Sequence, residues 1–219
     1  PDPNVRTPVR TPVRTPVRTP VKTPVKTPVK RSPVSYVDKL FEQGKELYDR
    51  KNYDDASDKF REVVITKPDH YEARLYLGWS YYFGDFYENA EYQATQIIDN
   101  SPSTDDHKGY LLRSWSNYKS GDSDESLYDI NQYINLQPQD AEGYGLRGEI
   151  LYYNKDYNGS YSSLKNALKR DPNLGFAHGF LGNISSIRGA PEKACEHWVK
   201  AVDLGASYYQ DHVTQNRCR

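Results

Sequence analysis

Residues 71–102 read YEARLYLGWSYYFGDFYENAEYQATQIIDNSP, and the pattern in this stretch sets the fold of the chain. Its first half carries Leu77 and Gly78 in an apolar segment, and its second half carries Ala90 ahead of Pro102. Apolar and small residues three and four positions apart are typical of amphipathic helices, and proline ends a helix because it lacks the N–H. We therefore predict two consecutive helices, of which the second ends at the proline.

The same pattern recurs along the chain with a nearly fixed period. Prolines stand at Pro68, Pro102, Pro138 and Pro172, spaced 34, 36 and 34 residues apart. A period of this size indicates a helical solenoid, in which each helix pair buries its apolar face against the next pair. The sequence therefore predicts an all-α fold.

Small residues recur where paired helices must approach closely. They are Gly44, Gly78, Gly148 and Gly182 in the first helix and Ala56, Ala90 and Ala194 in the second. With these residues and the closing prolines, the chain resembles the tetratricopeptide repeat family. The resemblance implies a right-handed superhelical solenoid of about five helix pairs over residues 36–206, followed by a capping helix at 207–219. The expected repeats are 37–70, 71–104, 107–140, 141–174 and 175–206.

The N-terminal segment, residues 1–35, has a different composition. Residues 7–30 are six copies of Thr-Pro-Val-Arg/Lys. Proline at every fourth position forbids a helix, so we predict an extended tail, either polyproline-like or strand-like.

The tail and the body carry opposite charges. Residues 1–31 hold eight basic residues against Asp2, a formal +7, which leaves −8 of the total of −1 for the remainder. No run of about 18 apolar residues occurs, so we expect no transmembrane segment.

Two observations bear on the compartment. The sequence contains no Met, which indicates a processed mature form or a fragment. Its two cysteines, Cys195 and Cys218, form either one disulfide in an oxidising compartment or two free thiols in a reducing cytosol. We expect a secreted or extracellular chain, with a cytoplasmic one as the alternative.

No motif for catalysis or metal binding is present. The histidines show no metal-ligand spacing. They are His70, His107, His178, His197 and His212. Cys195 and His197 are two residues apart on a helix, so they point in different directions and do not pair as nucleophile and base. We expect no cofactor, no metal and no enzymatic activity.

The resemblance implies that the first helix of each repeat lines a groove that receives an extended peptide. Position twelve of four successive repeats is tyrosine, two tryptophans lie one turn earlier, and position two carries three acids. These predicted groove residues are Tyr48, Tyr82, Tyr118, Tyr152, Trp79, Trp115, Asp38, Glu72 and Glu142. Such a surface suits a ligand that offers prolines to the rings and Arg or Lys to the acids. The alternative is that the tyrosines pack between neighbouring first helices.

Two functions from different classes fit these features. In the first, the chain is a self-associating structural subunit whose tail docks on neighbouring copies and builds a filament. A variant of this places O-linked sugars on the tail, at Thr7, Thr11, Thr15, Thr19, Thr23 and Thr27. In the second, the chain is a soluble adaptor for an extended partner peptide, and its flexible basic tail contacts anionic membrane or nucleic acid.

Overall fold

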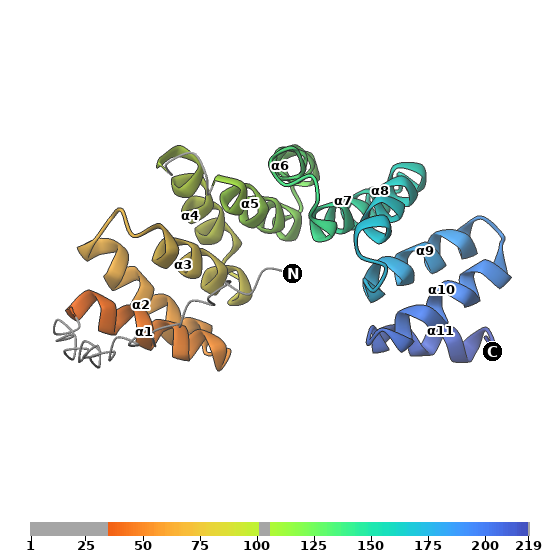
Figure 1. Cartoon of the computed structure of the whole chain (residues 1–219), viewed down its shortest axis with the longest axis horizontal. Helices are drawn as coiled ribbons and strands as arrows, with labels where there is room; N and C mark the ends of the chain where they lie inside the picture. The colour runs from red at the N-terminus through yellow and green to blue at the C-terminus, as the bar shows by residue number, and fades with distance from the viewer. Residues whose placement is uncertain (1–34, 101–105, 219) are drawn as a thin grey trace, which may run out of the picture. The chain divides into compact units, whose positions relative to one another are not determined.

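The computed structural model describes residues 35–100 and 106–218. Every regular element among these residues is helical, and they contain no strand (Figure 1). The predicted all-α fold is therefore confirmed. The predicted extended tail, with its six threonines, lies outside the described residues.

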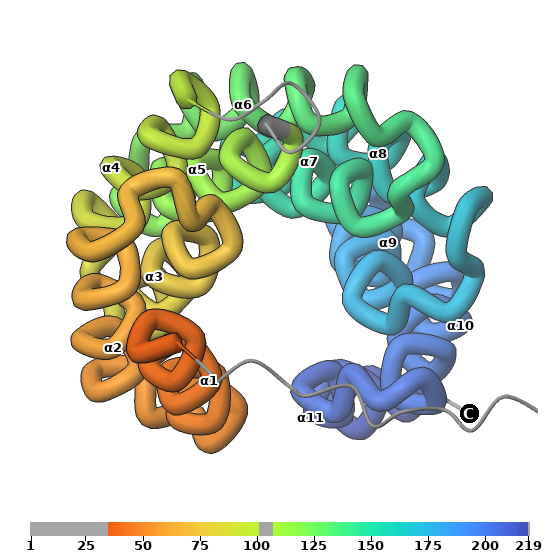
Figure 2. Tube along the Cα trace, turned by 60° about the vertical axis from the view of Figure 1, so that its left-hand side comes forward, coloured from red at the N-terminus to blue at the C-terminus, as the bar shows by residue number. Residues whose placement is uncertain are grey.

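The helices follow one another in five consecutive pairs and a short terminal segment. Their bounds are α1 (Tyr36–Asp49), α2 (Tyr53–Thr66), α3 (Tyr71–Phe83), α4 (Tyr87–Asn100), α5 (Asp106–Ser120), α6 (Ser123–Leu136), α7 (Ala141–Tyr153), α8 (Tyr157–Arg170), α9 (Gly175–Ile187), α10 (Pro191–Asp203), the 3₁₀ turn η1 (Ser207–Tyr209) and α11 (Gln210–Gln215). From α1 to α10, each helix packs against the next one along the chain (Figure 2). Each pair therefore presents its second helix to the first helix of the next pair, as a solenoid requires.

The turn inside each pair uses the same backbone geometry. A residue with positive φ stands one or two positions after the end of each first helix: Lys51, Asp85, Gly121, Lys155 and Gly189. In the first turn, the N–H of Asn52 donates to the Leu47 carbonyl at 2.9 Å and that of Lys51 to the Tyr48 carbonyl at 2.8 Å. This pair of bonds satisfies carbonyls that the helix end would leave unpaired.

Close helix contact explains the recurring glycines. A Cβ at Gly44 would lie 2.6 Å from Cε1 of Phe60, and one at Gly182 would lie 2.4 Å from Cδ1 of Trp198. Added Cβ atoms at Gly78 and Gly148 would clash in the same way with Leu112 and Leu164. The glycines therefore let large apolar side chains of a neighbouring helix reach the first helix.

The third pair replaces this contact with serine hydrogen bonds. Ser114 donates to the Ser126 carbonyl at 2.9 Å, and Ser126 donates to the Ser114 carbonyl at 2.8 Å. Both side chains are fully buried, so this reciprocal bonding removes the cost of burying two hydroxyls.

A buried ion pair also joins the two helices of the third pair. Arg113 Nε and Nη2 each donate to one oxygen of Asp129 at 2.8 Å. The Asp129 side chain is only 1% exposed, and Nη1 of Arg113 donates to Thr95 at 3.2 Å. The pair therefore links α4, α5 and α6.

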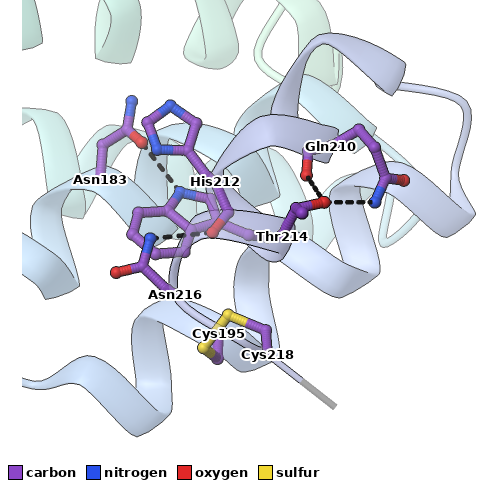
Figure 3. Close-up of a disulfide and its surroundings, with 8 residues drawn as sticks. Asn183, Cys195, Gln210, His212, Thr214, Asn216 and Cys218 are labelled. Atoms are coloured by element: carbon purple, nitrogen blue, oxygen red, sulfur yellow. Dashed lines mark hydrogen bonds between the residues drawn. A yellow bond between two sulfur atoms is a disulfide. The ribbon is translucent and has the colours of Figure 1, made fainter.

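The C-terminal segment closes the last helix pair. Tyr209 is buried against Gly179, where an added Cβ would lie 1.8 Å from the ring, and the His212 ring stacks on Trp198 at 4.8 Å between centroids. Cys195 of α10 and Cys218 form a disulfide with Cα atoms 5.1 Å apart (Figure 3). The segment thus covers apolar surface that a further repeat would otherwise bury.

Candidate binding face

Four of the predicted groove residues are the tyrosines of α1, α3, α5 and α7, and each contacts a ring of the next first helix. Tyr48 lies 5.2 Å from Tyr76 between ring centroids, and Tyr82 lies 6.0 Å from Trp115. Further along, Tyr118 lies 6.2 Å from Tyr153 and Tyr152 lies 5.1 Å from Phe180. The tyrosines therefore pack between neighbouring first helices, as the alternative interpretation held. All four remain partly exposed.

Residues that the sequence analysis missed complete this row of rings. Phe83 stacks on Tyr53 at 4.9 Å and contacts Trp79 at 5.9 Å, and Tyr153 contacts Phe180 at 6.0 Å. Phe83 and Tyr153 stand at position thirteen of their repeats, next to the tyrosine column, so extending the column by one position would have found them. We call the whole set the aromatic ladder, namely Tyr48, Phe83, Trp79, Tyr82, Trp115, Tyr118, Tyr153, Tyr152 and Phe180.

The surroundings of these rings raise the pKa of their hydroxyls. Burial raises the pKa of Tyr48 to about 12, and the neighbouring Tyr53 adds to this. Burial also raises the pKa of Tyr82 and Tyr118. Tyrosine hydroxyls titrate near about 10 in water, so they are neutral at physiological pH with or without this shift and are available as hydrogen-bond donors.

One pocket lies beside Tyr48 and Trp79 of the aromatic ladder. Its volume is about 530 Å³, and it brings together three of the predicted residues, Tyr48, Glu72 and Trp79. Leu75 and Tyr76 form further parts of its wall, and Lys108 also lines it, so the pocket holds one cationic side chain of the chain itself besides the Glu72 carboxylate. An apolar wall with a carboxylate at its edge can take a proline or aliphatic side chain next to a cation.

The three predicted acids have different surroundings. Asp38 accepts from the backbone N–H of Ser35 at 3.2 Å as part of the cap of α1, so its carboxylate already has a local partner. Glu72 lines the pocket, and Glu142 is exposed in the first turn of α7. The structure thus places only Glu72 beside the predicted aromatic residues.

A fourth acid, Glu149, lies within the ladder and was not predicted. It occupies position nine of its repeat, the position held by Trp79 and Trp115 in the two preceding repeats. Tyr118 donates its hydroxyl to Glu149 Oε1 at 3.2 Å. Reading position nine across all repeats would have found this residue.

Two histidines of the last pair form a contact that the sequence did not predict. His178 Nδ1 lies 3.1 Å from His197 Nδ1, and His178 Nε2 lies 3.2 Å from the Pro172 carbonyl oxygen. Because a carbonyl only accepts, a neutral His178 donates from Nε2 and accepts at Nδ1, so His197 donates from Nδ1. His197 is therefore a half-buried partner of His178.

This pair should make stability depend on pH. Burial lowers the pKa of both imidazoles, and the charge of Lys165 contributes in the same direction. Because the unfolded imidazoles titrate near about 6.5, the free energy of unfolding should fall as pH drops below that value. Urea unfolding of the natural chain and of a His178→Asn, His197→Asn double variant at about pH 7.5 and about pH 5.5 checks this. An equal drop in both would contradict it.

The clustering of possible metal ligands and the state of Cys195 can be read directly from the described residues. Within 35–100 and 106–218, no three His, Cys, Asp or Glu side chains are grouped so as to hold a metal ion. Cys195 is bonded to Cys218 and is not a free nucleophile. No helix in this part of the chain combines the length and the apolar character needed to cross a membrane.

Comparison with known proteins identifies the repeat. Residues 41–103 match the tetratricopeptide repeat family model. Hsp70-Hsp90 organizing protein 3 of Arabidopsis thaliana is 28% identical over 137 residues, which cover 59% of this chain and 23% of that protein. Hsp70-Hsp90 organizing protein 2 of the same plant is 28% identical over 94 residues, covering 41% of this chain and 16% of that protein. The chain therefore spans less than a quarter of the length of these curated relatives.

Several solved structures are similar over most of their length. A thermophilic tetratricopeptide repeat protein of Thermus thermophilus superposes with a TM-score of 0.66 at 16% identity, covering 82% of this chain and 98% of that chain. MamA of Desulfovibrio magneticus gives a TM-score of 0.66 at 17% identity, covering 80% and 98%. YrrB, described as a tetratricopeptide repeat protein with an unusual peptide-binding site, gives 0.60 at 15% identity, covering 80% and 90%. The match over residues 41–103 and these likenesses show that the chain has the fold of a tetratricopeptide repeat protein.

Proposed function

We propose that the chain is a non-enzymatic scaffold that binds extended polypeptides along the aromatic ladder. The observation that carries this proposal is the continuous row of partly exposed rings from α1 to α7, which ends on the buried Phe180 of α9 and has a pocket of about 530 Å³ at its beginning. Rigid aromatic rings bind proline-rich segments well, because such segments lose little conformational entropy on binding. Glu72 at the pocket edge adds a partner for a cation.

Within this proposal, the preferred ligand is the segment 7–30 of another copy. Its repeated unit offers one proline and one Arg or Lys every four residues. The formal charges of +7 on residues 1–31 and −8 on the remainder favour such contacts between copies and make them sensitive to salt. A tail that binds the next copy rather than its own leads to an open chain of subunits, and hence to a filament.

The first test measures peptide binding. A labelled peptide with the sequence of residues 7–22 should bind the full-length chain, and Trp79→Ala should weaken binding by about tenfold because it removes a wall of the pocket. The matched control is Tyr92→Ala, since Tyr92 lies on the second helix α4 and is 60% exposed. Fluorescence polarisation measures both affinities. Equal affinities of the two variants would contradict the proposed site.

The second test examines assembly. Electron microscopy at low and high salt should show filaments of the full-length chain that weaken with salt and disappear in a chain that begins at Ser35. Monodisperse particles under all conditions would reject the filament. They would favour the adaptor function, in which the ladder binds a different protein and the basic tail contacts anionic membrane or nucleic acid.

The compartment and the modification of the tail are part of the same proposal. The disulfide between Cys195 and Cys218 supports an oxidising, extracellular location, because cytosolic thiols are kept reduced. The regular Thr-Pro units of residues 7–30 support O-linked glycans in that compartment. Mass spectrometry of the tail from its native source measures the attached sugars directly.

A further inference from the structure

Glu149 is a partly buried carboxylate in an aromatic setting. Tyr118 donates to it at 3.2 Å, and Trp115 lies 6.2 Å from the Tyr118 ring between centroids. Among the ion pairs of residues 35–100 and 106–218, none within 4 Å includes Glu149. The chain therefore keeps a negative charge on the ladder without neutralising it by a direct ion pair.

The charge of Glu149 acts on tyrosines of three other elements. After burial, the charge of Glu149 is among the causes that raise the pKa of Tyr82 in α3, Tyr118 in α5, and Tyr208 and Tyr209 in η1. Tyr153 of α7 also acts on the pKa of Tyr208, so its ring belongs to the same group. Glu149 of α7 thus acts electrostatically on phenol rings of three other elements, and the hydrogen bond from Tyr118 places that ring directly beside the carboxylate.

Two of these rings are unusually open to solvent. Tyr153 is 59% exposed and Tyr208 is 65% exposed. An exposed aromatic ring costs free energy in water, and its face attracts a cation. Lys119 already shows this attraction, since its Nζ lies 5.7 Å above the centroid of the Tyr118 ring.

From this arrangement we infer that Glu149, with Tyr118 and Tyr153, forms a site for an Arg or Lys side chain from the segment 7–30 of a second copy. The carboxylate would supply an ion pair, and the exposed rings would cover the methylene stem and the cationic head. This inference rests on the proposed peptide binding and adds Glu149 as the residue that binds the cationic side chain of the peptide. We assign the site to the segment 7–30 because residues 1–31 carry a formal charge of +7 and the remainder carries −8, so the two are electrostatically complementary.

The protonation of Glu149 should make cation binding depend on pH. Burial raises the pKa of the Glu149 carboxyl, whereas the Tyr118 hydrogen bond and the charge of Lys119 lower it. A further cation would lower it more, so binding should stabilise the charged form. Affinity for a basic peptide should therefore fall as pH drops through the raised pKa, because the protonated carboxyl has no charge to offer.

The decisive experiment varies the charge on both partners. Two labelled peptides are used, one with the sequence of residues 7–22 and one with its four basic residues replaced by Gln. In the full-length chain, Glu149→Gln should weaken binding of the basic peptide by about tenfold and leave the neutral peptide within about twofold. The matched control is Glu192→Gln, an exposed acid on the second helix α10, which should change both affinities by less than about twofold.

The outcomes separate this inference from the proposed function. If Glu149→Gln weakens the binding of both peptides equally, or of neither, the proposed role of Glu149 in binding a cation is overturned. A loss of affinity in Trp79→Ala would in that case still support peptide binding on the aromatic ladder. If neither peptide binds the unchanged chain, the proposed function and this inference both fail. Sedimentation of the full-length chain tests the source of the cation: a chain that stays monomeric at peptide-binding concentrations would overturn the assignment to a second copy.

The Glu149→Gln variant should fold. Because burial disfavours the charged carboxylate, removing the charge should leave thermal stability unchanged or slightly higher, and the amide oxygen can still accept from Tyr118. Circular dichroism during heating measures this. A marked loss of stability would show that Glu149 acts through the fold and would overturn the inference.

Discussion

Replacing Asp129 with alanine should lower the free energy of unfolding by about 3–5 kcal/mol. The carboxylate is 1% exposed and accepts two hydrogen bonds of 2.8 Å from Arg113. In this variant, the Arg113 guanidinium stays partly buried but has no counter-charge. The free energy cost of such an unpaired charge is far larger than the net stabilisation that the ion pair provides. Urea denaturation followed by circular dichroism measures the loss.

Two further variants make this prediction specific. Asp124→Ala removes an exposed acid from the first turn of the same helix and should cost less than about 1 kcal/mol. Replacing both partners, as Arg113→Met with Asp129→Leu, should recover most of the lost stability, because an apolar pair needs no compensating charge. A loss below about 1 kcal/mol for Asp129→Ala would mean that water reaches the guanidinium readily.

Reduction of the Cys195–Cys218 disulfide should lower the free energy of unfolding by about 3 kcal/mol. The bond joins residues 23 positions apart, and opening it restores conformational freedom to the unfolded chain. The loss should appear first in the C-terminal segment, which packs on α10 through the stack of His212 on Trp198. Tryptophan fluorescence during urea unfolding, with and without reductant, follows this transition.

The control for the disulfide is a Cys195→Ala, Cys218→Ala double variant. Its unfolding curve should resemble that of the reduced natural chain and should not respond to reductant. A natural chain whose unfolding midpoint is the same with and without reductant would contradict the prediction. Such a result would mean that helix packing alone holds the terminal segment in place.

The candidate site was only partly predictable, because the position of a residue in its repeat does not determine which contacts its side chain makes. Position twelve correctly marked four tyrosines on the first helices, but their mutual contacts depend on which residues the next helix brings opposite them. Asp38 and Glu72 share position two, yet one caps its own helix and the other lines a pocket. Glu149 was overlooked because it replaces a tryptophan in its column.

The helical solenoid and its period could be predicted from the amino-acid order alone. The regularly spaced prolines and the recurring Gly and Ala positions suffice for this, because a repeat that buries the same face in every copy must repeat its apolar and small residues. Among the five turns inside the helix pairs, the residue with positive φ could be predicted from the sequence only where it is glycine, at Gly121 and Gly189. The residue types at Lys51, Asp85 and Lys155 do not predict this conformation. There the closing hydrogen bonds of the turn impose the conformation on an ordinary side chain.

The partners of the charged and polar side chains became visible only in the folded chain. The partnership of Arg113 with Asp129, the contact of His178 with His197 and the placement of Glu149 among tyrosines all join residues from different helices. Such contacts depend on how far each helix is rotated and shifted against its neighbour. A hydrophobic period fixes the face that a helix buries, but it leaves open which polar atoms lie within hydrogen-bonding distance across the helix boundary.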